Sequence, residues 1–289
     1  VARLAGGLVS LNVKKGDTVV VYMPMIPHAV FSMLACARIG AIHSVVFGGF
    51  APRELAMRID DTKPKALLTA TSGIEVDRII PYKPMVDEAI EMADHKPEHV
   101  IIHNRKLGAK NPKKSIDIDY DELVEKAEAV GYESLASDHP LYILHTSGTT
   151  GSPKGVVRDT GGYATALKYS MDAVYNIEPG ETFWAASDVG WVVGHSYIVY
   201  APMINRNPTI VYEGKPVRTP DAGSYWRVIQ DHQVNVMFTA PTAFRAIKRE
   251  DPEGKFIQQY DISSLRYQFV AGERCDENTL NWAKEHLQI

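Results

Sequence analysis

The chain has 289 residues, 45% of them hydrophobic, so it is long enough to bury a large core as one large domain or two ordinary ones. Its 31 basic and 35 acidic residues leave a formal charge of −4, a balance that argues against nucleic acid or a membrane surface as a partner. The sequence has no apolar run near the ~20 residues of a membrane span, and Cys36 and Cys275 predict neither a disulfide framework nor a zinc site.

Short apolar runs alternate with amphipathic runs along most of the chain. This alternation predicts parallel strands joined by crossover helices, and therefore an α/β fold of layered, parallel-rich sheets flanked by helices. Pro27 suits a first helical turn, and apolar residues recur at helical spacing from Val30 to Ala37. We expect strands at 18–23, 42–47, 65–70, 99–103, 141–145, 182–185, 208–212, 235–239 and 267–271. We expect further helices at 52–61, 121–130, 163–174, 224–232, 241–249 and 277–286.

A polar stretch and a set of histidines lie near the middle of the chain. Residues 106–119 include glycine, proline and several lysines, which predicts an exposed excursion. His95, His99 and His103 have the spacing of a helical metal site. Pro97 breaks the helix that such a site requires, and residues 99–103 read as a strand. The sequence therefore nominates no metal ligand, and it nominates no catalytic acid, base or nucleophile.

Residues 146–155, T-S-G-T-T-G-S-P-K-G, follow a predicted buried strand and hold more backbone freedom than any other stretch. Their glycines permit positive φ and close backbone approach, so successive N–H groups can turn toward one anion. Hydroxyl groups and one lysine add donors and a positive charge, which suits a polyphosphate. One alternative is a flexible surface loop. A Walker A loop needs Lys directly after Gly, and Lys154 follows Pro153 instead, so that pattern fails.

These ten residues resemble the phosphate loop of the adenylate-forming superfamily, which includes acyl-CoA synthetases, luciferases and peptide-synthetase adenylation domains. The resemblance identifies the loop as the site that holds the phosphates of ATP. By this resemblance the phosphate-binding residues are Thr146, Ser147, Gly148, Thr149, Thr150, Gly151 and Lys154.

A second segment, S-D-V-G-W-V-V-G-H-S-Y at 187–197, sets an aromatic residue between two glycines after a strand. By itself this pattern is typical of core packing. In short-chain acyl-CoA synthetases a similar G-W-V-x-G-H segment lines the acyl pocket, and its Trp restricts the pocket to two or three carbons. The resemblance implies that Trp191, Val192 and Val193 form pocket walls and that His195 lies beside the carboxylate or is a structural histidine.

Two further segments, T-A-P-T-A at 239–243 and V-A-G-E-R at 270–274, each lead from a strand into a loop. Seen alone they are ordinary β-to-α turns. Ligands in open α/β sheets gather at the carboxyl ends of strands, so we expect these loops to converge with the phosphate loop on one face. The family packs a G-E pair along the adenine, which nominates Gly272 and Glu273, with Arg274 in place of the Pro usual in acetate enzymes.

The resemblance to short-chain acyl-CoA synthetases extends over nearly the whole chain. V-V-R-D-T-G-G-Y at 156–163, A-G-E-R-C-D at 271–276 and G-I-E at 73–75 resemble the propionate-activating branch more than the acetate branch. Acetate enzymes commonly carry an Arg that meets the phosphates of CoA where this chain has Glu75. Arg78 is the remaining candidate for contact with the CoA phosphates. The alternative is that Arg78 is an ordinary surface residue.

The resemblance implies a reaction in two halves. A carboxylate attacks the α-phosphorus of ATP, accompanied by Mg²⁺, to give an acyl-adenylate and pyrophosphate, and the thiol of CoA then displaces AMP. The implied partners are these small molecules, with propionate or acetate as the acid. The implied location is the cytoplasm or the mitochondrial matrix.

A helical pattern is already present at the first residues, with no capping residue before it. Another helical pattern runs almost to Ile289 without a stop signal. Together these ends predict an internal piece of a longer protein. Family members continue into a W-W-Q-T-E segment and a C-terminal lid domain that carries the adenylation Lys. Residues 1–289 then form a partial N-terminal AMP-binding domain, and we expect this chain alone to have little synthetase activity. A nucleotide- or adenylate-binding fragment or pseudoenzyme without turnover is the alternative from another class.

Overall fold

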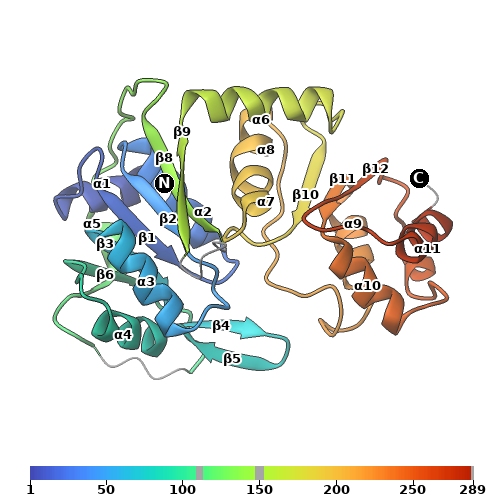
Figure 1. Ribbon diagram of the computed structural model, residues 1–289, viewed down its shortest axis with the longest axis horizontal. Helices are drawn as coiled ribbons and strands as arrows, with labels where there is room; N and C mark the ends of the chain where they lie inside the picture. Colours follow the sequence, from blue (N-terminus) through green and yellow to red (C-terminus); the bar gives the residue numbers. More distant parts are fainter. Residues whose placement is uncertain (109–112, 147–152, 288–289) are drawn as a thin grey trace. The chain divides into compact units, whose positions relative to one another are not determined.

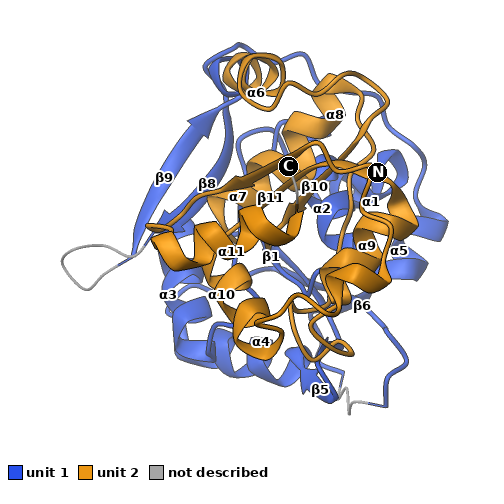
Figure 2. Cartoon of the chain, turned by 90° about the vertical axis from the view of Figure 1, so that its right-hand side faces the viewer, with its two compact units in different colours: residues 1–163 blue, residues 164–289 orange. Residues whose placement is uncertain are grey.

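The computed structural model describes residues 1–108, 113–146 and 153–287. The chain divides into two compact units, residues 1–163 and residues 164–289, which Figure 2 shows in different colours. The flanks of the predicted phosphate loop belong to the first unit. The predicted acyl and adenine segments belong to the second unit.

Unit 1 is built on a seven-stranded sheet with the order β7-β6-β3-β1-β2-β8-β9 (Figure 1). Neighbouring strands are parallel except for β8 and β9, which are antiparallel. The strands are β1 Thr18–Tyr22, β2 Ile42–Val45, β3 Ala66–Ala70, β6 His99–His103, β7 Asp117–Asp119, β8 Pro140–Thr146 and β9 Lys154–Asp159. A separate hairpin joins β4 Ser72–Glu75 to β5 Arg78–Pro81.

Two groups of helices cover this sheet. One group contains α1 Ala2–Ser10, α2 Pro27–Arg38 and α5 Tyr120–Lys126, and the other contains α3 Pro52–Thr62 and α4 Tyr82–Met92. Val20 and Tyr22 of β1 pack into a core cluster with α3 and α4. Val19 and Val21 point to the opposite face and are fully buried as well. Burial on both faces explains why the central strands read as continuous apolar runs.

Unit 2 holds a parallel sheet with the order β10-β11-β12. Its core packs Trp184 of the sheet against Trp226, Phe244 and Trp282 of three helices. The strands are β10 Thr182–Ala186, β11 Val234–Thr239 and β12 Tyr267–Val270. The helical segments are α6 Gly161–Ala173, α7 Val192–Gly194, a π-helix His195–Tyr200, α8 Ala201–Asn205, α9 Ser224–His232, α10 Pro241–Glu250, a 3₁₀ turn Ile257–Gln259 and α11 Glu277–Leu287.

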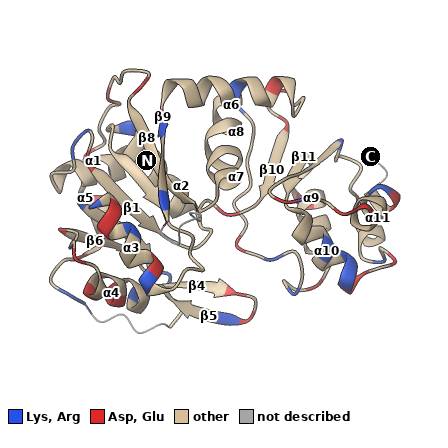
Figure 3. Cartoon of the chain, viewed as in Figure 1, with Lys and Arg blue, Asp and Glu red and all other residues tan. Residues whose placement is uncertain are grey.

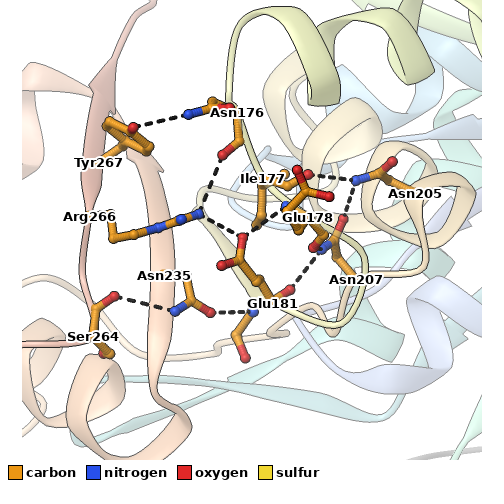
Figure 4. Close-up of polar contacts among 11 residues, drawn as sticks. Asn176, Ile177, Glu178, Glu181, Asn205, Asn207, Asn235, Ser264, Arg266 and Tyr267 are labelled. Atoms are coloured by element: carbon orange, nitrogen blue, oxygen red, sulfur yellow. Dashed lines mark hydrogen bonds and ion pairs between the residues drawn. The ribbon is translucent and has the colours of Figure 1, made fainter.

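Side-chain amides join the amino ends of these three strands (Figure 4). Asn235 accepts a hydrogen bond from the backbone N–H of Thr182 at 2.8 Å and donates one to the carbonyl of Ser264 at 3.4 Å. Arg266 pairs with Glu181 at 2.6 Å between Nη2 and Oε2. Further contacts join Asn205 and Asn207 to the carbonyls of Ile177, Glu178 and Glu181, and Asn176 to Tyr267.

The structure confirms most predicted elements and corrects others. The helix predicted at 224–232 has those bounds, and the strand predicted at 99–103 likewise. The strand predicted at 208–212 is wrong, because Thr209 makes only an isolated bridge to Phe183. Pro208 precedes it and has no N–H for a ladder. The exposed excursion expected at 106–119 is only partly correct, because its last three residues form the edge strand β7. Hairpin β4–β5 and strand β9 were not predicted.

Basic and acidic side chains are mixed over both units. Figure 3 shows both signs on α3 and α4 and again on α10 and α11. An anion site must therefore come from a local arrangement of donors. Within the described parts of the chain, no helix is both long and apolar enough to cross a membrane.

Candidate functional site

The predicted phosphate loop connects two antiparallel strands. The register of β8 and β9 continues to a pairing of Thr146 with Lys154. Ser147, Gly148, Thr149, Thr150 and Gly151 lie outside the described residues. Lys154 is exposed and starts strand β9. A Walker A loop leads into a helix, so the strand that follows this loop excludes the P-loop alternative.

A buried histidine anchors the start of the loop. Nε2 of His145 lies 2.8 Å from Oδ2 of Asp61 in α3. Burial lowers the pKa of His145, although Asp61 favours its protonated form. A Cβ on Gly155 would lie 2.9 Å from Cγ2 of Ile143 and 3.1 Å from Oδ2 of Asp61. The last glycine of the motif therefore serves close packing, and it does not have positive φ.

Three loops of unit 2 leave neighbouring parallel strands at one edge of the sheet. Thr239, the last residue of β11, donates from Oγ1 to the carbonyl of Ala186 at the end of β10, at 3.0 Å. The N–H of Ala271, just after β12, donates to the carbonyl of Thr239 at 3.3 Å. These bonds bring the predicted acyl and adenine segments to the same sheet edge, where ligands bind in open α/β folds.

The predicted acyl-pocket residues differ in exposure. Trp191 is 48% exposed and Val192 is 49% exposed, while Val193 is half-buried. His195 is fully buried at the start of the π-helix. Burial lowers the pKa of His195 to about 4, against the backbone groups of Trp191 and Val189. Trp191 and Val192 therefore present an apolar surface to solvent, and His195 is neutral near pH 7.

Asp188 follows β10 and precedes this apolar surface. Burial raises the pKa of its carboxyl group to about 6. The N–H of Gly190 donates to Oδ1 at 2.7 Å, and Lys215 adds a positive charge, so both oppose that shift. Asp188 is the one residue of this loop whose charge changes close to neutral pH through burial.

Asp188 and His195 change stability with pH in opposite directions. The folded state binds the proton of Asp188 more tightly, with a pKa of about 6 against 3.8, so this contribution falls as pH rises from 4 to 6. The folded state binds the proton of His195 less tightly, with a pKa of about 4 against 6.5, so this contribution rises with pH over 4 to 6.5.

We expect the Asp188→Asn variant to lose the contribution of Asp188 to stability, which falls as pH rises, and to keep the contribution of His195. Relative to the unchanged protein, its free energy of unfolding should increase between pH 4 and pH 7 by up to about 3 kcal/mol. Urea unfolding at both pH values measures this difference. Asp231→Asn changes an exposed carboxyl in the same unit and is the control. A pH-independent difference between Asp188→Asn and the unchanged protein contradicts the prediction.

The predicted adenine segment is held by α10. Gly272 has φ +97°, a conformation that favours glycine. The carboxylate of Glu273 accepts hydrogen bonds from the N–H and Oγ1 of Thr242, and Nη1 of Arg245 lies 3.1 Å away. These bonds lower the pKa of Glu273. Arg245 also donates to the carbonyl of Arg274 at 2.8 Å, so one side chain holds two successive residues of the segment.

The predicted CoA contact lies on the β4–β5 hairpin of unit 1. Arg78 is exposed, and its Nη2 lies 2.6 Å from Oε2 of Glu75. The guanidinium is thus already paired with the residue that stands where acetate enzymes carry an arginine. An exposed pair of this kind contributes little stability, so the guanidinium can leave Glu75 at low cost.

Sequence reasoning missed three residues that shape these loops. Asp188 lies inside the acyl segment, and a carboxylate directly after a buried strand was its signal. Thr242 and Arg245 lie at the start of α10 and fix the 272–274 loop. The P-T-A-F-R sequence that opens α10 gave no sign of these contacts, because their partners are about 30 residues away.

The chain is similar to several known proteins over its whole length. A family model described as AMP-binding enzyme matches residues 1–289. Acyl-CoA synthetase short-chain family member 3, mitochondrial, of Rattus norvegicus is 55% identical over 100% of this chain and 42% of its own length. Propionate–CoA ligase of Salmonella typhimurium is 48% identical over 99% of this chain and 45% of its own length.

A further relative is acyl-CoA synthetase short-chain family member B, mitochondrial, of Dictyostelium discoideum, which is 50% identical over 98% of this chain. The chain spans less than half the length of these curated relatives, with 42% of the Dictyostelium protein covered. The family model covers every residue of the chain. The chain therefore belongs to the AMP-binding enzyme family.

Proposed function

We propose that the protein containing this chain is a short-chain acyl-CoA synthetase that converts ATP, propionate and CoA to propionyl-CoA, AMP and pyrophosphate. The observation that carries the proposal is the hydrogen-bonded edge of the unit 2 sheet. Thr239 and Ala271 join three strand ends there, which supports one binding site shared by the 191–195 and 272–274 loops. Membership of the AMP-binding family supports adenylate chemistry at that edge.

Each segment has a defined part in this proposal. Residues 146–154 hold the β- and γ-phosphates through N–H groups, hydroxyls and Lys154. Gly272 and Glu273 lie along the adenine, with Arg245 fixing their position. Trp191 and Val192 cover the short acyl chain. Positioning and charge neutralisation dominate such phosphoryl chemistry, so the chain needs no catalytic base.

The cosubstrates follow from the same reaction. ATP and CoA are substrates, with Arg78 as the candidate residue for CoA. Mg²⁺ accompanies the phosphates of ATP, and we assign it no ligand among the described residues. The proposed location is the mitochondrial matrix or the cytoplasm, and the word mitochondrial in the names of the rat and Dictyostelium relatives supports the matrix.

Propionate is the preferred acid in this proposal. A pocket that separates propionate from acetate uses one methylene, worth about 1–3 kcal/mol, or roughly 10- to 200-fold in kcat/KM. The full-length protein is therefore expected to show its highest kcat/KM with propionate among acetate, propionate and butyrate. Pyrophosphate release measures all three. An optimum for acetate contradicts the propionate assignment but leaves the synthetase reaction intact.

Replacing Trp191 with alanine in the full-length protein tests the pocket wall. The ratio of kcat/KM for butyrate to that for propionate should rise, because the shortened side chain leaves room for more carbons. Tyr169→Ala removes another aromatic ring, 70% exposed on α6, and is expected to leave the ratio unchanged. Tight nucleotide binding without acid-dependent pyrophosphate release would instead identify a binding-only protein.

The isolated chain is expected to release little pyrophosphate. It spans only 42% of the rat relative and 45% of the Salmonella relative. The family's Mg²⁺-binding Glu and adenylation Lys belong to the portion beyond these motifs. Turnover by residues 1–289 at the rate of the full-length protein contradicts this expectation.

A further inference from the structure

Three side chains of unit 1 meet where three elements begin or end. His28 is the second residue of α2, His103 is the last residue of β6, and Asp121 is the second residue of α5. One ligand atom from each lies within 4.8 Å of the other two. Among the residues that the structure describes, this is the one group of His, Cys, Asp and Glu side chains that converges in this way.

The two imidazole rings lie face to face. Their centroids are 3.6 Å apart, with an angle of 18° between the ring planes. Nδ1 of His103 is 3.3 Å from Oδ2 of Asp121. The His103 side chain is 16% exposed and that of Asp121 is 60% exposed, so the carboxylate opens the group to solvent. An ion can therefore reach the two rings from the side of Asp121.

The ring nitrogens leave bonding capacity unused. The Nδ1 atoms of His28 and His103 are both buried, and neither forms a hydrogen bond with the described residues. A buried polar atom without a hydrogen bond costs free energy, so native structures keep few of them. Each ring therefore keeps a buried nitrogen without a hydrogen bond in a group that also contains the carboxylate of Asp121, which indicates a ligand that binds all three residues.

Charged groups near His28 act on a bound ion in opposite directions. A neutral imidazole offers a lone pair to a metal ion. Arg105 is the nearby cation that weakens binding of an ion, and Asp121 supplies the compensating negative charge.

The donor set determines the class of ligand. Two imidazole nitrogens and one carboxylate oxygen suit first-row divalent ions such as Zn²⁺, whereas Mg²⁺ and Ca²⁺ prefer oxygen donors throughout. Because the rings stack, one of them must turn about χ2 before both lone pairs meet at one ion. That torsion of histidine is broad, and Tyr120 holds the rings only by edge-on contacts at 5.1 Å and 5.8 Å.

This group differs from the histidine series seen in the sequence. Nε2 of His95 is occupied at 2.9 Å from the carbonyl of Pro64, and His99 lies at the opposite end of β6 from His103. Only His103 of that series takes part. Its partners come from residues 28 and 121, which no sequence spacing could connect.

We propose that His28, His103 and Asp121 bind one first-row divalent cation of the Zn²⁺ class, with solvent at the remaining coordination position. The ion joins the start of α2, the end of β6 and the start of α5. Its role is to stabilise this corner of unit 1, since no group of the proposed synthetase reaction lies among these residues. The inference therefore stands apart from the proposed function.

Calorimetry on the tag-free, full-length protein with Zn²⁺ alone tests the proposal. We expect saturable binding of one ion per chain, and Co²⁺ in its place should give a visible absorption band of a nitrogen-ligated site. Asp121→Asn should weaken Zn²⁺ binding at least about 10-fold. His103→Gln should abolish it. His99→Gln, on the same strand, is the matched control and should bind as the unchanged protein does.

Asp121→Asn keeps the test independent of folding, because Asp121 is exposed and its substitution leaves the core intact. Zn²⁺ should raise the thermal unfolding midpoint of the unchanged protein and of His99→Gln but not that of Asp121→Asn. Absence of saturable binding by the unchanged protein overturns the proposal. An equal loss of affinity in His99→Gln and Asp121→Asn overturns it as well.

Discussion

Replacing Lys83 with methionine is expected to lower the stability of unit 1 by about 3–5 kcal/mol, because two carboxylates lose the cation that compensates them. Lys83 is fully buried in α4, with Nζ 2.6 Å and 2.8 Å from the two oxygens of Asp87. Nζ also lies 3.0 Å from Oδ2 of Asp117, whose side chain is 3% exposed. Methionine fills a similar volume, so the loss measures the missing charge.

Part of the charge balance survives the substitution. Lys114 lies 3.5 Å from Oδ1 of Asp87 and can take over one contact. Asp117 has no such substitute in the described residues, so strand β7 should open first. The expected effect therefore concentrates on the β6–β7 edge.

Hydrogen exchange of the β6 and β7 amides, together with urea unfolding, measures this effect. Lys126→Met is the control, because Lys126 makes a similar i, i+4 contact to Glu122 at 3.0 Å but is 75% exposed. An exposed pair contributes only about 0.2–1 kcal/mol. Equal losses in Lys83→Met and Lys126→Met would contradict the argument from burial.

Replacing Gly194 with alanine is expected to distort the 187–195 loop and to cost about 1–3 kcal/mol or more. A Cβ at this position would lie 1.8 Å from the carbonyl oxygen of Asp188 and 2.7 Å from the N–H nitrogen of Val189. These are backbone atoms, so the chain itself must move. Gly194 has ordinary helical angles, φ −65° and ψ −47°, so the clash is the whole cause.

The Gly194→Ala substitution also tests the proposed acyl pocket. Displacement of Asp188 moves Trp191, whose N–H donates to the carbonyl of Asp188 at 3.0 Å. In the full-length protein kcat/KM for propionate should fall strongly. Gly131→Ala is the control, because no atom lies within 4 Å of its added Cβ. Unchanged stability and activity in Gly194→Ala would show that the loop tolerates the displacement.

The sequence predicted the buried parallel strands well because burial on both faces leaves a simple signal. β1, β3 and β6 are short runs of apolar residues, and their neighbours α2 and α3 begin with Pro27 and Pro52. β7 has the sequence D-I-D and joins the sheet only at its edge. No local pattern predicts such a strand, because its partner strand and Lys83 are distant in sequence.

The candidate site was predictable in part. The strand-end rule predicted that the 239–243 and 270–274 segments converge, and the hydrogen bond between Ala271 and Thr239 confirms this. The bond from Thr239 to Ala186 adds the 187–197 segment, and the expected convergence with the phosphate loop stays a prediction. The spacing of residues in the 187–197 segment did not predict that Trp191 is exposed and His195 buried. The π-helix that begins at His195 changes which side chains share a face, and apolar periodicity at 3.6 residues does not reveal it.

The amide contacts at the amino ends of β10, β11 and β12 have a consequence for redesign of unit 2. Asn235 fixes the register of its own strand against Thr182 and against Ser264. Strand alignment is thus set at the end of the sheet opposite Trp191 and Gly272. If the loops on the carboxyl side hold the acid as proposed, they can be exchanged or lengthened to test other acids while the strands keep their alignment.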